Sequence, residues 1–231
     1  MKKLLLFVPV ILLFSSCGND AGNENTAAIA KGNRSYGGTF RINETEKYQT
    51  LYPMSITDVI SANVAFQIYE GLVKFNPKDI TSVLPSIAES WKMDSSGTVY
   101  TFVLKKDVKF HDDACFPDGK GRNVKAADVK YSFELACSNS PDNANFGGTY
   151  SNRIKGANEY YEGKSAEVSG IKVLDDYTVQ ITLNVRSSSF LYILAGQAGY
   201  IIPKEAVDKY GNMAHIGTGP FSFVEPSDKT G

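Results

Sequence analysis

The residues that could carry out acid–base or metal chemistry are few in this chain and lie far apart. The only histidines are His111 and His215, and the sequence has no HExxH, P-loop or nucleophile-elbow motif. His111 stands in Phe-His-Asp-Asp, so Asp112 or Asp113 could join it in a metal site. A loop histidine with exposed carboxylates accounts for the same pattern. We therefore predict no catalytic residue, no metal and no cofactor.

Residues 217–220, Gly-Thr-Gly-Pro, begin like the glycine loop of a dinucleotide-binding motif. The third glycine position is Ser222, and the following residues are typical of a turn and a strand rather than of a helix. We therefore do not expect a nucleotide cofactor here.

Two cysteines, Cys115 and Cys137, are candidates for a disulfide. A bridge would close a loop of about 20 residues and could add roughly 3 kcal/mol of stability. Two buried free thiols are the alternative, since the Cα separation that decides between them is not encoded in the spacing.

Residues 1–17 have the pattern of an export signal. Lys2 and Lys3 precede an apolar run, residues 4–14, which is too short to span a membrane as a helix. The junction at Cys17 resembles a bacterial lipobox. Phe14 departs from this pattern, because a small or aliphatic residue is usual three positions before the cysteine. We expect Cys17 to be lipidated and the protein to be exported and held on a membrane. A plain secretory signal with an incidental Cys17 is the alternative.

Residues 18–35 are rich in Gly, Asn and Ala and predict a flexible tether. The 24 basic and 25 acidic residues give a net charge of −1. Such a balance provides no basic surface for nucleic acid, so we expect no nucleic-acid partner.

The periodicity of the remaining chain predicts an α/β or α+β fold with a mixed sheet. Ser61 could cap a helix that ends near Gly71, and Asp128 could lie in the first turn of another. The expected elements are strands over 37–42 and 99–104 (the latter buried on both faces), a hairpin over 170–185 with its apolar residues on two faces, and helices over 190–194 and 204–210.

Seven segments, in this order, resemble the family 5 extracellular solute-binding proteins, the peptide- and nickel-binding components of ABC importers. They are residues 51–53 (LYP), 68–72 (IYEGL), 84–91 (LPSIAESW), 100–111 (YTFVLKKDVKFH), 127–132 (ADVKYS), 201–204 (IIPK) and 217–221 (GTGPF). Tyr52 and Asp113 depart from the family pattern, and residues 115–122 are an insertion.

The resemblance implies a type II periplasmic-binding-protein flytrap. Residues 36–69 and 203–231 would belong to the first lobe, and residues 70–202 would form a small extra domain. The second lobe of the family is absent from this sequence, which looks like the N-terminal part of a longer protein.

The resemblance also implies a function and a site. Peptides would lie between the lobes, held by main-chain hydrogen bonds, and the closed form would deliver them to a permease served by an ATPase. The first-lobe ligand strand falls on Thr57, Asp58 and Val59, where Asp58 could pair with a peptide amino group or merely cap the next helix. Asn145 and Phe146 fall in a loop that could reach the cleft or form a surface turn.

We expect a monomeric oligopeptide- or dipeptide-binding lipoprotein, not an enzyme. Two alternatives stay open. One is a binder of another solute of this family, such as a nickel complex or an oligosaccharide. The other is an exported hydrolase, which would need a nucleophile–base pair.

Overall fold

The computed structural model describes residues 28–30, 34–36 and 41–224 of the chain. The chain divides into two units, Met1–Asn43 and Glu44–Gly231. In the first unit, strands β1 (Ala28–Ala30) and β2 (Arg34–Tyr36) pair antiparallel.

These strands fall largely within residues 18–35, the segment predicted as a tether. The signal segment and Cys17 lie outside the described residues. The strand predicted for residues 37–42 lies there as well, apart from Arg41 and Ile42, which belong to no strand.

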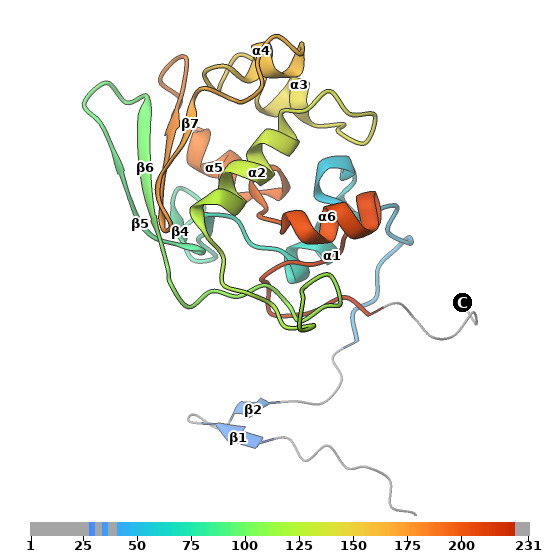
Figure 1. The fold of residues 1–231 in the computed structure, drawn as a ribbon. Helices are drawn as coiled ribbons and strands as arrows, with labels where there is room; N and C mark the ends of the chain where they lie inside the picture. The colour runs from blue at the N-terminus through green and yellow to red at the C-terminus, as the bar shows by residue number, and fades with distance from the viewer. Residues whose placement is uncertain (1–27, 31–33, 37–40, 225–231) are drawn as a thin grey trace, which may run out of the picture. The chain divides into compact units, whose positions relative to one another are not determined.

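The larger unit contains a four-stranded sheet with the strand order β5-β6-β8-β7 and a two-stranded sheet of β3 and β4 (Figure 1). The strands are β3 (Val73–Phe75), β4 (Val83–Pro85), β5 (Ala88–Met93), β6 (Val99–Leu104), β7 (Ile171–Asp175) and β8 (Thr178–Thr182). Every strand pairing in the described part of the chain is antiparallel, so the expectation of a mixed sheet was wrong for this part.

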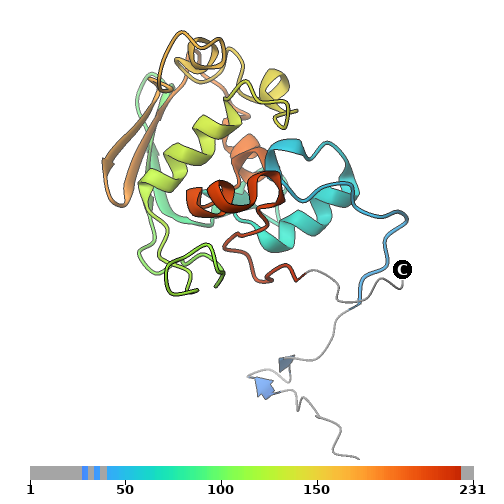
Figure 2. The same cartoon turned by 45° about the vertical axis from the view of Figure 1, so that its right-hand side comes forward.

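Strand β6 occupies the middle of the large sheet and buries one face. Tyr100, Phe102 and Leu104 are buried, whereas the residues between them are partly or fully exposed. The sequence had predicted burial on both faces. The difference arises because helices cover only one side of the sheet in the two views (Figures 1 and 2).

The hairpin predicted over residues 170–185 is confirmed as β7 and β8. Ile171 and Val173 share one face with Val179 and Ile181, because Ile171 lies opposite Ile181 and Val173 lies opposite Val179. The prediction that they divide between two faces was wrong.

Helix α2 packs across β7 and β8 on the covered side of the sheet. The helices of the larger unit are α1 (Val59–Ile68), α2 (Ala126–Ala136), α3 (Phe146–Thr149), α4 (Ala157–Tyr161), α5 (Phe190–Ala195) and α6 (Lys204–Tyr210), with 3-10 turns η1 (Pro53–Ser55), η2 (Gln197–Gly199) and η3 (Gly211–Met213). The helix predicted over 204–210 is confirmed by α6. Helix α1 starts two residues before the predicted cap Ser61 and ends at Ile68, before Gly71.

One core serves the whole larger unit. Residues of the predicted first-lobe segment, such as Leu51 and Ile56, share it with residues of the predicted extra domain, such as Phe133 and Phe190. Val207, from the last predicted segment, packs against the same core. The division at residues 70 and 203 stays a prediction.

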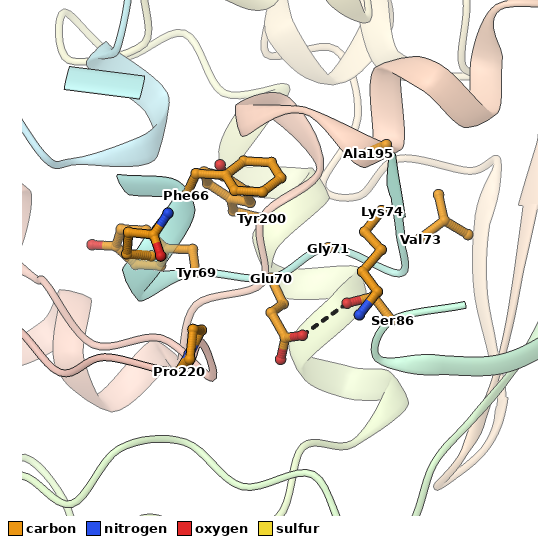
Figure 3. A pocket seen from close by; sticks show the side chains of 11 residues that line it. Phe66, Tyr69, Glu70, Gly71, Val73, Lys74, Ser86, Ala195, Tyr200 and Pro220 are labelled. Carbon is orange, nitrogen blue, oxygen red and sulfur yellow. Dashed lines mark hydrogen bonds between the residues drawn. The ribbon is translucent and has the colours of Figure 1, made fainter. Parts of the chain in front are cut away.

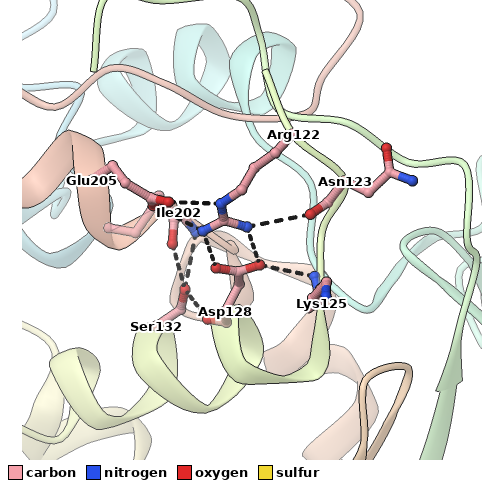
Figure 4. Close-up of polar contacts among 7 residues, drawn as sticks. All are labelled: Arg122, Asn123, Lys125, Asp128, Ser132, Ile202 and Glu205. Atoms are coloured by element: carbon pink, nitrogen blue, oxygen red, sulfur yellow. Dashed lines mark hydrogen bonds and ion pairs between the residues drawn. The ribbon is translucent and has the colours of Figure 1, made fainter. Parts of the chain in front are cut away.

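A charged network centred on Arg122 joins the loop before α2 to α2 and α6 (Figure 4). The Arg122 guanidinium donates to both oxygens of Asp128, at 2.7 and 2.8 Å, and to both oxygens of Glu205, at 2.7 and 2.8 Å. It also lies over the rings of Phe110 and Phe116. Such bidentate, charge-assisted pairs fix geometry as well as adding energy.

Asp128 also organises the start of its own helix. Its second oxygen accepts a hydrogen bond from the main-chain N–H of Lys125 at 2.8 Å, which confirms the acidic first turn expected from the sequence. One turn later, the buried Ser132 hydroxyl accepts from the N–H of Ile202 at 3.0 Å. The segment 127–132 therefore stabilises the fold through its polar side chains.

Arg122→Met should lower the free energy of unfolding by about 1–3 kcal/mol, since it leaves the nearly buried Asp128 carboxylate without its cation. Urea unfolding followed by circular dichroism measures the change. Lys204→Met is the matched control. Both side chains of the Lys204–Asp208 pair are exposed, so the pair should contribute less than about 0.5 kcal/mol to the free energy of unfolding. Equal effects of the two substitutions would contradict the assignment.

The same network predicts a pH dependence. Hydrogen bonds from Arg122 lower the pKa of Glu205 in the folded state. The resulting stabilisation is present above the usual carboxylate range and is lost as the pH falls through the lowered pKa. Arg122→Met should therefore flatten the acid limb of the stability–pH profile.

Candidate functional site

The segment predicted to contact ligand runs extended between η1 and α1. Ile56 and Asp58 have extended backbone angles, and Thr57 between them is exposed. Within the described residues, the main-chain N–H and C=O of Thr57 have no hydrogen-bond partner. Thr57 thus presents a free donor and a free acceptor, which are the groups that an extended peptide pairs with.

Asp58 is the N-cap of α1. Its Oδ1 accepts from the N–H of Ser61 at 2.8 Å, and hydrogen bonds from Ser61 lower the pKa of the carboxyl, so it is ionised at neutral pH. Its Oδ2 is buried and has no partner among the described residues. Capping therefore uses one carboxylate oxygen, while the surrounding chain covers the other, so the carboxylate can act on a ligand through its negative charge.

Ser61, which the sequence offered as the cap, has a different role. Its hydroxyl accepts from the N–H groups of Gln49 at 2.9 Å and Thr50 at 3.3 Å. This ties the preceding chain to the first turn of α1 and fixes the position from which Asp58 and Thr57 project.

Asn145, the third predicted site residue with a polar side chain, lies against the same segment. Its Nδ2 donates to the carbonyl oxygens of Met54 at 3.1 Å and Ile56 at 3.0 Å. The neighbouring Ala144 N–H donates to Met54 as well, at 3.0 Å. The structure thus brings the two predicted segments together, with Asn145 positioning the residues that precede Thr57.

The remaining two predicted residues differ in exposure. Val59 is 73% exposed at the start of α1 and offers an apolar surface beside Thr57. Phe146 is buried and stacks on Tyr161 with ring centroids 4.1 Å apart. In this structure its ring belongs to the core below the loop rather than to the exposed surface.

His111 and the glycine loop, which looked unrelated in the sequence, lie together. The His111 Nε2–H donates to the carbonyl oxygen of Gly219 at 2.8 Å, and the His111 N–H donates to that of Gly217 at 2.9 Å. Among the described residues no group of three or more His, Cys, Asp or Glu side chains could hold a metal ion. In the described part of the chain, the contacts of His111 are therefore those that stabilise the loop of residues 217–219.

The two glycines are needed because this loop touches the end of α1. A Cβ on Gly217 would overlap the carbonyl oxygen of Ile68, and one on Gly219 would lie 2.5 Å from that of Gln67. Gly219 also donates to Ile68 at 2.8 Å. The pattern that begins like a nucleotide loop is a close main-chain contact.

A pocket of about 210 Å³ opens beside the C-terminal end of α1 (Figure 3). Tyr69 and Tyr200 line it and stack with ring centroids 5.5 Å apart, and burial raises the pKa of both. Glu70 accepts from the hydroxyls of Ser86 at 3.0 Å and Thr218 at 3.1 Å. Sequence reasoning read residues 68–72 as a helix end and a family motif, so it missed this pocket.

Cys115 and Cys137 are free thiols in the structure, so the disulfide offered as one alternative is not formed there. Cys115 is half-buried beside Asp113, whereas Cys137 is buried at the end of α2. Burial raises the pKa of each thiol to about 12, which makes both poor nucleophiles.

The fold is that of the type II periplasmic binding proteins. Residues 82–230 match the model of the bacterial extracellular solute-binding proteins, family 5 (middle region). The chain belongs to this family. The match confirms the resemblance noted from the seven sequence segments.

Relatives and solved structures agree on the class. Over 68% of this chain, the sequence is 36% identical to the dipeptide-binding protein of Escherichia coli. Over 97% of this chain, it is 30% identical to heme-binding protein A of Haemophilus influenzae. The DppA protein of Helicobacter pylori, solved with the peptide STSA, superposes on 77% of the chain with a TM-score of 0.62 and 30% identity.

The chain spans only part of these proteins: 30% of the dipeptide-binding protein, 41% of heme-binding protein A and 35% of the Helicobacter protein. The family is one of transport binding proteins, which supports a binding rather than an enzymatic role. None of the helices in the described ranges has the length and hydropathy of a membrane span.

Gly217→Ala should destabilise the protein by about 1–3 kcal/mol or more, because its methyl group would overlap the main chain of α1. Gly147→Ala is the matched control: nothing lies within 4 Å of its Cβ position in α3. That substitution should be neutral or stabilising by up to about 1 kcal/mol. Thermal unfolding of both variants checks this, and a Gly217→Ala protein as stable as Gly147→Ala would contradict the contact.

Proposed function

We propose that this chain belongs to a peptide-binding lipoprotein that delivers oligopeptides or dipeptides to an ABC importer. The observation that carries the proposal is the free extended edge at Thr57 beside the ionised, partly unpaired carboxylate of Asp58. A peptide running along this edge would pair its main chain with Thr57 and place its ammonium group near the negative charge of Asp58.

The neighbouring residues support this role. Asn145 holds the preceding carbonyl groups, so the edge is positioned before a ligand arrives. Val59 supplies an exposed apolar surface for a ligand side chain. The names of the dipeptide-binding relative and of the peptide complex point to the same ligand class.

The delivery step involves other proteins. The binding protein acts as a monomer, needs no cofactor, and presents bound peptide to the permease, while the associated ATPase hydrolyses ATP. Export by the segment 1–17 and a lipid on Cys17 keep it close to the membrane that holds the permease.

Substitutions at Asp58 separate ligand binding from helix capping. Asp58→Asn keeps a good N-cap but removes the charge, so it should retain the melting temperature and weaken tri-alanine binding about tenfold or more. Asp58→Ala should lower both. Isothermal titration and thermal shift of the full-length protein measure the two quantities.

The control is N-acetyl-tri-alanine, which has no ammonium group and should bind Asp58→Asn and the parent protein equally. Unchanged tri-alanine affinity in Asp58→Asn would exclude the proposed pairing. The melting temperature also tests the class of ligand. If haem, a nickel chelate or an oligosaccharide raises it and no peptide does, the ligand is that solute and not a peptide.

Cys17→Ser should release the exported protein from membranes. In cells expressing the parent protein, detergent phase separation should place it in the detergent phase, because an acyl chain at Cys17 partitions there. The variant should appear in the aqueous phase or retain its uncleaved signal. A parent protein found wholly in the aqueous phase would show that Cys17 is incidental.

A further inference from the structure

A second pocket, of about 300 Å³, opens at the edge of the large sheet next to β5. Strand β5 is a terminal strand of the order β5-β6-β8-β7, so one of its sides has no neighbouring strand in the sheet. Trp91 and Met93 of this strand line the pocket together with Leu191 of α5. None of the residues 54–59 or 142–146 contributes to its lining.

The apolar wall follows from the sheet register. Trp91 lies opposite Phe102 and Met93 lies opposite Tyr100, so both side chains project on the face that the core covers further inside the sheet. At the edge this cover ends. Trp91 is therefore only half-buried and Met93 is 46% exposed, although the rings of Trp91 and Phe102 lie 6.4 Å apart.

The cationic group of the pocket is Arg186. Its side-chain stem crosses the β5–β6 turn at Gly97, where a Cβ would lie 2.8 Å from the Arg186 Cδ and where φ is +74°. The glycine thus allows the arginine to lie close over the turn. Within the described part of the chain, the guanidinium has no ion-pair or hydrogen-bond partner.

The other polar groups of the lining are hydroxyls, which can donate to an anion as well as accept. Tyr100 is 4% exposed, lines the pocket, and its hydroxyl has no hydrogen-bond partner in the described ranges. Burial raises the pKa of Tyr100, so the phenol keeps its proton. Ser187 and Ser188 add hydroxyls, of which that of Ser187 also lies 3.3 Å from the Ser189 hydroxyl. The nearby Asp94 is not in the lining, and its carboxylate accepts from Ser96 and from the turn's own N–H groups.

We propose that this pocket binds a carboxylate carried on an apolar or aromatic body. The carboxylate pairs with Arg186 and the Tyr100 hydroxyl, and the body packs on Trp91 and Leu191. An unpaired guanidinium beside an aromatic wall, with no acidic residue in the lining, favours an organic anion over a cation or a neutral sugar.

Two sources could supply this chemistry: a free aromatic acid, or the C-terminal residue of an extended peptide that also pairs with the open side of β5. N-acetyl-phenylalanine represents the first source, and N-acetyl-Ala-Ala-Phe with a free carboxylate represents the second. A much tighter tripeptide identifies the peptide end as the natural ligand, and equal affinities identify the small acid.

Trp91 is the single tryptophan of the 231 residues, so its fluorescence reports directly on the pocket. Titrating the full chain with N-acetyl-phenylalanine should shift the emission saturably, and the corresponding amide should bind at least about tenfold more weakly. Arg186→Gln should lose at least about tenfold in affinity for the acid, and Tyr100→Phe should lose less.

Lys92→Gln is the matched control, because Lys92 lies between Trp91 and Met93 on the same strand and is exposed on the opposite face. It should leave the affinity unchanged, as should Asp58→Asn. Equal binding of acid and amide, an Arg186→Gln protein that binds normally, or no saturable shift would each overturn the proposal. Circular dichroism of the variants verifies that they are folded, and none of these outcomes depends on peptide binding at Thr57.

Discussion

The guanidinium of Arg122 joins the loop before α2 and the first turn of α2 to α6, which is distant in sequence. A half-exposed cation with two carboxylates is stable here because each oxygen receives a hydrogen bond and the aromatic rings below exclude water from one side. Asp128 completes the arrangement by capping the helix that lies across the large sheet. The network therefore fixes the position of α6 relative to α2.

The other family segments act in the same way, by contacting one another. Glu70 links to Thr218, and His111 links to Gly219, so residues 68–72, 100–111 and 217–221 form a single set of contacts around the end of α1. Because these segments stabilise the fold, recognising them identifies the family and leaves the ligand open. The groups that we propose for ligand binding come instead from residue types that carry no motif, such as Thr57.

Local patterns predicted the elements that local forces determine. The hairpin of β7 and β8 and the helix α6 followed from alternation and from the stop at Gly211. Long-range contacts decided the rest: Ser61 lost its capping role because its hydroxyl accepts from Gln49, and β6 buries one face because helices cover one side. The pocket around Trp91 could not be foreseen, since it depends on Arg186, which is distant in sequence.

The chemistry of the Thr57 edge also limits what it can select. Main-chain donors and acceptors are common to every peptide, so pairing with them contributes affinity without distinguishing side chains. In the proposed site, Asp58 would add a preference for a positive charge at one end and nothing further along the ligand. Selection among solutes would then depend on side chains outside this segment. A main-chain edge such as that at Thr57 is thus compatible with relatives that are named for different ligands.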